Sequence, residues 1–226
     1  MGPGMSFDLA LVQEMAPEIA RAFGLTVLTW IGGVLGALVL GFAVALMRRY
    51  GPRPLGLLLL AYVELMRGTP FLIQLFLLYY GGPSIGLSLD PVPAGLIGLS
   101  LYGAAYFSEI FRTGFEAVPP GHIEAGECAG LGRSQIMRRI IIPEMTMLVL
   151  PALINMVIIL LKETAMLSLI TVQELTMVVS VIGTQKYAFM TAMTLLALFY
   201  WVLVEISGAL GALAEARLAR FRFAPA

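Results

Sequence analysis

The feature that most limits how this chain can fold is a run of 25 residues, 23–47, that contains no Asp, Glu, Lys or Arg. An α-helix rises about 1.5 Å per residue, so about 20 apolar residues cross the hydrocarbon core of a bilayer. The apolar region of a secretory signal peptide is shorter, roughly 7 to 15 residues. We therefore expect the run to be a retained first membrane span.

Four further apolar runs are long enough to cross or nearly cross a bilayer: residues 55–80, 92–111, 145–161 and 187–213. The composition agrees, because only 12% of the residues are charged, whereas soluble domains carry about 25%. The sequence therefore predicts an all-α integral membrane protein with five transmembrane helices. We find no internal repeat, so we expect a single transmembrane domain with its core at residues 20–215.

The arginines predict the orientation of the spans. Ten of the 14 basic residues lie after the first span, between the third and fourth, and at the C-terminus: Arg48, Arg49, Arg53, Arg112, Arg133, Arg138, Arg139, Arg217, Arg220 and Arg222. With five spans these segments share one side, and an excess of Lys and Arg marks that side as cytoplasmic. The N-terminus is then outside and the C-terminus cytoplasmic.

Other classes of function are disfavoured. The net charge is zero, which gives no electrostatic case for nucleic acid. One cysteine and one histidine cannot form a zinc cluster, and no GxxxxGK[ST] phosphate-binding motif occurs. We expect no metal and no cofactor in this chain. The first twenty residues have two open interpretations, a short helix on the outer surface or a mobile terminus.

The loop between the third and fourth spans, residues 112–142, is too long to be a simple turn. Pro119 and Pro120 can open a short helix with Glu124 in its first turn. Gly130 and Gly132 then end this helix. Ser134 is a plausible N-cap for a second helix, and Pro143 leads into the fourth span. Such a helix-turn-helix could dock on a soluble partner, and a solvated loop is the alternative.

Charged residues inside apolar runs need partners or water. Glu64 and Arg67 share a helix face ahead of Gly68, Thr69 and Pro70, which predicts a broken helix restarted by Thr69. Broken helices often line solute sites, but a kinked span with a structural ion pair is an equal alternative.

Other polar residues lie within or at the ends of the apolar runs. Lys162 and Glu163 could match the charges of a zwitterionic solute, with Thr164 beside them. The alternative is that Lys162 and Glu163 pair with each other at the membrane interface. Gln74 completes the solute-site candidates, and Glu109 is expected to anchor the loop, with Arg112 as its partner.

The long loop resembles the signature of bacterial ABC importer permeases, Glu-Ala-Ala, three residues, Gly, nine residues, Ile-x-Leu-Pro. Here it reads EAG, ECA, G, LGRSQIMRR, IIIP, with Gly126 and Ile142 as departures. The resemblance implies a coupling helix that docks on an ATPase subunit. The residues that would carry the coupling are Glu124, Ala125, Gly126, Gly130, Leu131, Ile140 and Pro143.

Three more stretches resemble permeases for polar amino acids and opines: residues 64–82 (ELMRGTPFLIQLFLLYYGG), 104–126 (AAYFSEIFRTGFEAVPPGHIEAG) and 160–170 (LLKETAMLSLI). His122 and Glu163 depart from the usual glutamine and aspartate. The likeness implies a type-1-like transmembrane domain in a bacterial inner membrane, paired with a second permease copy or a homologue.

The resemblance also implies the other partners. ATP and Mg would be bound by two ATPase subunits, and a solute-binding protein would deliver the solute from outside. Two alternatives are an ion-gradient transporter or channel, which leaves the signature loop unexplained, and a membrane anchor that only recruits an ATPase, which leaves the intramembrane charges unexplained.

Overall fold

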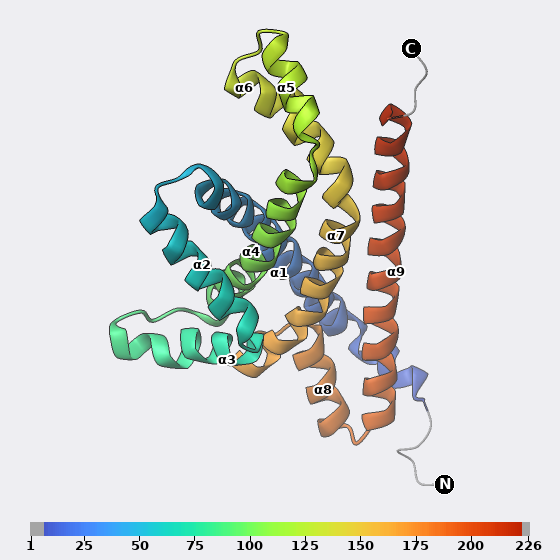
Figure 1. Ribbon diagram of the computed structural model, residues 1–226. Helices are drawn as coiled ribbons and strands as arrows, with labels where there is room; N and C mark the ends of the chain where they lie inside the picture. The colour runs from blue at the N-terminus through green and yellow to red at the C-terminus, as the bar shows by residue number, and fades with distance from the viewer. Residues whose placement is uncertain (1–6, 223–226) are drawn as a thin grey trace.

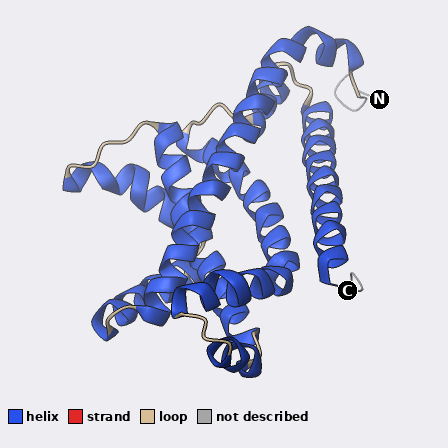
Figure 2. Ribbon diagram, turned by 90° about the horizontal axis from the view of Figure 1, so that it is seen from above, coloured by secondary structure: helices blue, strands red, loops and turns tan. Residues whose placement is uncertain are grey.

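The computed structural model describes residues 7–222, and all regular structure in that range is helical (Figure 2). The helices along the chain are α1 (Leu9–Tyr50), α2 (Arg53–Gly68), α3 (Phe71–Phe76), α4 (Pro91–Ala117), α5 (Pro120–Cys128), α6 (Arg133–Ile136), α7 (Ile142–Glu163), α8 (Leu175–Gln185) and α9 (Phe189–Arg222). Short π-helical and 3-10 segments join several of them: η1 (Leu77–Gly81), η2 (Gly82–Ile85), η3 (Met137–Ile141) and η4 (Thr164–Ile170).

Within the described residues, four helices are long and apolar enough to cross a membrane, and a bent pair brings the number to five when it is counted as one span. The four are Leu9–Tyr50, Pro91–Ala117, Arg133–Ile170 and Phe189–Arg217. They contain the predicted first, third, fourth and fifth spans. The first and last described residues lie at opposite ends of the molecule (Figure 1), as an odd number of spans requires.

The predicted second span is broken. Helix α2 ends at Gly68, and the segment from Phe71 to Ile85 leaves it at an angle of 111°. Pro70 explains the break, because proline disfavours the helical conformation in the residue before it and has no N–H to donate. Sequence analysis predicted this break, but the expected role of Thr69 in restarting the helix is wrong. Thr69 follows the last residue of α2, and its hydroxyl donates back to the carbonyl of Leu65 at 2.8 Å.

The N-terminal segment is neither a separate surface helix nor a mobile end over residues 9–22. It is the first part of the 42-residue helix α1, with Asp8 as N-cap. Leu11 and Ile19 pack with Val179 of α8 and with α9. The burial of one apolar face against α8 and α9 explains why this polar-looking stretch is ordered.

Helix α4 lies at the centre of the fold. In its membrane-length window 61% of the residues are buried, against 22% to 28% in the other three long helices. Its main neighbour is α1, which crosses it (Figure 1). Small residues allow the approach, because a Cβ on Gly41 would lie 2.9 Å from the backbone oxygen of Ala104. Close backbone contact at small residues is the usual way for membrane helices to associate.

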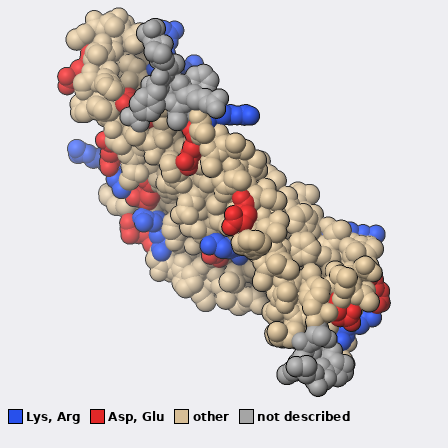
Figure 3. Space-filling model, turned by 90° about the vertical axis from the view of Figure 1, so that its right-hand side faces the viewer, with Lys and Arg blue, Asp and Glu red and all other residues tan. Residues whose placement is uncertain are grey.

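The remaining three long helices expose apolar side chains. Helix α9 stands beside α7 and α8, and Leu198, Trp201 and Leu210 on it are 47%, 60% and 63% exposed. Uncharged surface dominates the face shown in Figure 3, with charged side chains near the two ends, along one edge and at a few places in the middle. A bilayer or neighbouring membrane subunits would cover such a surface.

Candidate functional site

The predicted cytoplasmic loop folds into a helical hairpin. Helix α5 ends in a turn at Gly130, whose φ of +74° favours glycine. The N–H of Leu131 donates to the oxygen of Gly126 at 3.0 Å, and that of Gly130 donates to Glu127 at 2.9 Å. This is the Schellman pattern of helix ends. The prediction that Gly130 permits the turn is confirmed.

The second helix of the hairpin starts differently from expectation. Its N-cap is Gly132, so the assignment of Ser134 as N-cap is wrong. The side-chain oxygen of Gln135 accepts the N–H of Gly132 at 3.0 Å, which satisfies an otherwise unpaired donor at the turn. Glu124 is also one turn later than predicted, because α5 begins at Pro120.

This second helix is continuous with α7 through the π-helical segment η3. The N–H of Ile142 bonds to the oxygen of Met137, five residues back. Pro143 follows immediately, and an α-helical turn would press its ring against the carbonyl of Arg139. The wider π turn relieves that contact. Pro143 therefore shapes the junction between hairpin and span.

Gly126 lets the two arms of the hairpin touch. It is buried, and a Cβ at this position would lie 2.7 Å from Cδ1 of Ile140 and 3.3 Å from Cγ1 of Ile136. A buried cluster that includes Ile136, Ile141 and Phe115 then fixes the hairpin to the ends of α1 and α4. Gly126 and Ile140, both predicted coupling residues, thus pack against each other where they line the groove between α5 and α7.

Other predicted coupling residues remain available to a partner. Glu124 and Ala125 are exposed on α5, and Glu124 has no side-chain partner among residues 7–217. A groove of about 740 Å³ runs between α5 and α7, with Leu131 and Pro143 in its wall. His122 bridges it by a contact of 2.8 Å between Nδ1 and Glu144 Oε2. The hairpin stands furthest out of the molecule (Figure 1), beyond the ends of the long helices α1 and α4.

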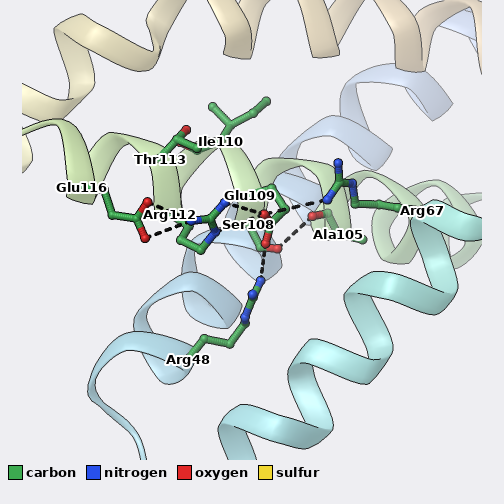
Figure 4. Close-up of polar contacts among 9 residues, drawn as sticks. All are labelled: Arg48, Arg67, Ala105, Ser108, Glu109, Ile110, Arg112, Thr113 and Glu116. Carbon is green, nitrogen blue, oxygen red and sulfur yellow. Dashed lines mark hydrogen bonds and ion pairs between the residues drawn. The ribbon is translucent and has the colours of Figure 1, made fainter.

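A second polar site joins the C-terminal parts of α1, α2 and α4 (Figure 4). Glu109 accepts hydrogen bonds from Arg48 and from Nε of Arg112, the latter at 3.0 Å. Arg67 lies 3.8 Å from the same carboxylate, and Arg112 also binds Glu116. The predicted anchoring contact of Glu109 with Arg112 is confirmed, and the structure adds two arginines from other helices.

The alternative in which Glu64 and Arg67 form a structural ion pair is wrong. Arg67 turns to Glu109 and lies over the ring of Tyr106 at 5.6 Å. Glu64 is exposed and has no ion pair among residues 7–217. Glu109 is only 17% exposed, so water screens its charge less than that of the exposed Glu64.

Gln74 satisfies the carbonyls that the broken helix leaves free. Its Nε2 donates to the oxygen of Met66 at 2.8 Å, to the oxygen of Thr69 at 3.0 Å and to the Thr69 hydroxyl at 2.8 Å. These groups lie at the end of α2, where no following helical turn can supply donors. In this conformation the Gln74 amide stabilises the break.

The other solute-site candidates lie where α7 ends and η4 begins. Thr164 is buried, and its hydroxyl donates to the oxygen of Leu161 at 2.7 Å. Lys162 is exposed and has no carboxylate within ion-pair distance among residues 7–217, so the interfacial pair with Glu163, which was the alternative, is not formed. Glu163 is half-buried, close enough to the Tyr102 hydroxyl for its charge to act on it.

Aromatic side chains of α4 connect the two candidate segments. The ring of Phe71, just after the break, lies 5.0 Å from that of Tyr102. The Tyr102 hydroxyl donates to that of Tyr106 at 3.4 Å, and Arg67 lies over Tyr106. The structure thus brings the broken helix and Glu163 to one face of α4.

Sequence analysis missed a buried carboxylate, Glu174. Its oxygens accept the N–H groups of Thr176 and Met177 at 2.8 Å each and the hydroxyl of Tyr200 at 3.3 Å. The Thr26 hydroxyl of α1 completes the site by accepting the N–H of Leu175 at 2.9 Å. Glu174 is fully buried and joins α1, α8 and α9. Its position directly before the apolar helix α8 (Leu175–Gln185) was the available signal, that of an N-cap.

Together these features define a class of protein: a polytopic membrane subunit with a broken second span and a helical hairpin held beyond one end. Comparison with known families agrees. Residues 14–220 match the family described as the binding-protein-dependent transport system inner membrane component, and the chain belongs to this family. As a member, it is a multi-pass permease subunit that is not itself a catalyst, and the family implies ATPase and binding-protein partners.

Individual relatives are of the same kind. The chain is 34% identical over 215 residues to the probable amino-acid ABC transporter permease protein YckA of Bacillus subtilis, covering 95% of each chain. It is 35% identical over 227 residues to the L-cystine transport system permease protein TcyB of the same organism, covering 98% of this chain and 94% of the relative.

Solved structures give the same fold. A chain in a crystal structure of an amino acid ABC transporter with histidines superimposes with a TM-score of 0.86 at 32% identity, covering 94% of this chain and 100% of the other. An inward-facing structure of the MetNI methionine ABC transporter has a TM-score of 0.76 at 20% identity, covering 91% and 98%. At that identity the second likeness concerns the fold alone.

Proposed function

We propose that the chain is the membrane-spanning permease of an ATP-driven importer for polar amino acids or related small zwitterionic solutes. The observation that carries the proposal is the exposed hairpin of α5 and α6 on a fold whose relatives at 34% and 35% identity are named for amino-acid and L-cystine transport. The solved relative at 32% identity is named as an amino acid transporter crystallised with histidines.

The hairpin is proposed to dock on an ATPase subunit. Glu124 and Ala125 are the exposed contacts on α5, and Leu131 and Pro143 contribute the groove beside them. Gly126, Gly130 and Ile140 keep the shape of the hairpin, because they form its internal contact and its turn. A rigid amphipathic hairpin suits insertion into a groove of a partner.

The solute is proposed to pass beside the face of α4 that carries Tyr102 and Tyr106. Glu163 and Lys162 would match the ammonium and carboxylate of the solute. Glu64, Arg67, Thr69, Gln74 and Thr164 are the remaining candidates. In the present conformation Thr164 and Gln74 bond to backbone oxygens, so their solute contacts would require these bonds to exchange.

The proposed assembly contains two permease chains, either two copies of this one or this chain and a homologue, with two ATPase subunits that bind ATP and Mg. A solute-binding protein delivers the solute on the N-terminal side. The complex lies in a bacterial inner membrane with the N-terminus outside and the C-terminus in the cytoplasm. The basic residues near the ends of α1 and α9 support this orientation.

The test is reconstitution in liposomes with the ATPase and binding protein encoded beside this chain. We expect one class of amino acid to stimulate ATP hydrolysis. Glu124→Ala should weaken ATPase binding, whereas Glu18→Ala, an exposed carboxylate at the other end of the molecule, should not. Equal ATPase binding by both variants and the wild type would contradict the docking assignment.

The solute site needs its own comparison. Glu163→Ala should raise the solute concentration required for half-maximal stimulation without changing ATPase binding. Glu205→Ala removes an exposed carboxylate from α9 and serves as the control. Equal solute dependence in the Glu163 variant and the wild type would assign Glu163 a structural role. Uptake driven by an ion gradient without ATP would favour the alternative transporter class.

A further inference from the structure

A basic groove lies at the turn between α1 and α2, apart from the hairpin and the solute-site candidates. It encloses about 440 Å³, and its wall includes Arg48, Arg49 and Arg53 at one end and Leu57 and Leu60 at the other. No acidic residue lines it. Its volume falls in the range of ordinary ligand sites, roughly 300 to 1,000 Å³.

Two of its three arginines have no counter-charge. Arg48 is paired with Glu109. Arg49 donates through Nε to the Tyr50 hydroxyl at 3.0 Å, and neither it nor Arg53 forms an ion pair within residues 7–217. Both are exposed. The groove therefore has about two uncompensated positive charges, and the guanidinium groups have the geometry to bind the oxygens of a phosphate.

The backbone adds to the positive potential. Helix α2 is 16 residues long and begins at Arg53, at the bottom of the groove, with Pro52 as its N-cap. No side chain caps its first turn. The free N–H groups and the helix dipole favour an anion at this end. This contribution reinforces the arginines and would not define a site without them.

The other end of the groove is apolar. Arg53, Leu57 and Leu60 are spaced i, i+4 and i+7 and so share one face of α2. Leu57 is 67% exposed and Leu60 is 38% exposed. A ligand that fits this face has an anionic head for the arginines and an apolar tail for the leucines. A free phosphate or nucleotide has no apolar chain that could pack against the leucines.

The position of the turn fits the headgroup layer of a membrane. The hairpin of α5 and α6 projects further out than the α1–α2 turn (Figure 1). A hairpin that docks on a soluble partner must stand in water, so the turn beneath it lies nearer the bilayer. Basic pockets between membrane helices on the cytoplasmic side are suited to anionic lipid headgroups.

We propose that this basic groove binds an anionic phospholipid, with its phosphate on Arg49 and Arg53 and an acyl chain along Leu57 and Leu60. The assignment concerns lipid and not the transported solute. Its placement at the headgroup layer rests on the proposed docking of the hairpin, whereas lipid binding by the purified chain is measured without the ATPase.

The test uses the purified full-length chain in detergent micelles and measures binding of fluorescent phosphatidylglycerol and phosphatidylcholine. Loss of one arginine near an anionic lipid lowers the affinity about five-fold. The double variant Arg49→Gln, Arg53→Gln should therefore bind phosphatidylglycerol about 30-fold more weakly than the wild type. Phosphatidylcholine binding should hardly change. Arg138→Gln with Arg217→Gln removes the same charge outside the groove and should keep the preference for phosphatidylglycerol.

Two further arms fix the source of the anion and the role of the leucines. Leu57→Asn with Leu60→Asn should weaken binding of the intact lipid but not of glycerol phosphate. Equal affinity for both lipids in the wild type, or an equal loss in the two arginine pairs, would overturn the proposal. Displacement of the lipid by inorganic phosphate alone would assign the groove to a free anion. Unchanged thermal unfolding of each variant shows that a loss of binding is not a loss of folding.

Discussion

Replacing Glu109 by Gln tests how the C-terminal parts of α1, α2 and α4 are held together. The substitution keeps the size and hydrogen-bonding oxygen of the side chain but removes the charge that three arginines share. Removing one partner of a buried ion pair costs about 3 to 5 kcal/mol, whereas exposed pairs contribute about 0 to 1 kcal/mol. Glu109 and Arg48 are 17% and 15% exposed, which places this pair nearer the buried limit.

The other two contacts are weaker by the same reasoning. The side chains of Arg67 and Arg112 are 41% and 39% exposed, and Arg67 lies 3.8 Å from the carboxylate. We therefore expect Glu109→Gln to lower the free energy of unfolding by about 2 to 4 kcal/mol, most of it through Arg48. In double-mutant cycles, Arg48→Gln should couple to Glu109→Gln by about 2 kcal/mol and Arg67→Gln by less than about 0.5 kcal/mol.

The measurement is reversible unfolding in mixed micelles, with Glu116→Gln as the matched control. Glu116 also binds Arg112, at 2.8 Å, but its side chain is 56% exposed. Its loss should cost less than about 0.5 kcal/mol. Equal destabilisation by the two Gln variants, or equal coupling of Arg48 and Arg67 to Glu109, would refute the argument from burial.

Three further substitutions test local features. Gln74→Leu should lower the free energy of unfolding by about 1 to 3 kcal/mol, because it leaves carbonyls at the helix break without a donor. An unchanged free energy of unfolding would show that the amide does not stabilise the break. Gly126→Val should reduce ATPase binding by displacing α5 from Ile140, whereas Gly121→Val, with no atom within 4 Å, should not. Gly130→Ala should destabilise the hairpin by about 1 to 2 kcal/mol because φ is positive there. Gly132→Ala should hardly change the stability of the hairpin. An equal loss of stability in the Gly130 and Gly132 variants would contradict the Schellman turn.

The sequence predicted the elements that depend on local signals. Apolar runs with few charges indicated the spans, because an ionised group in the bilayer is costly. The Gly-Thr-Pro sequence at residues 68–70 indicated the break, because it combines a poor helix former with a helix breaker. The end of the first hairpin helix at Gly130 followed from the place of this glycine between two helical patterns. Each of these signals acts within a few residues.

The errors concern interactions between distant segments. One alternative paired Arg67 with Glu64, three residues away, but Arg67 pairs with Glu109 on another helix. The ordering of the N-terminal segment depends on the faces of α8 and α9, which no local pattern in residues 9–22 reveals. Glu174 lay in an expected outer loop and is instead buried beneath three helices.

The docking of the N-terminal segment on α9 also sets an order for folding during synthesis. The N–H of Asp8 donates to the hydroxyl of Thr191, 183 residues later in the chain. At about 5 to 20 residues per second, a ribosome needs roughly 10 to 40 s to add that length. For this interval the apolar face of the N-terminal segment has no partner within its own chain. The first helix is therefore completed last, and factors that hold an unpaired helix during membrane insertion would act on it.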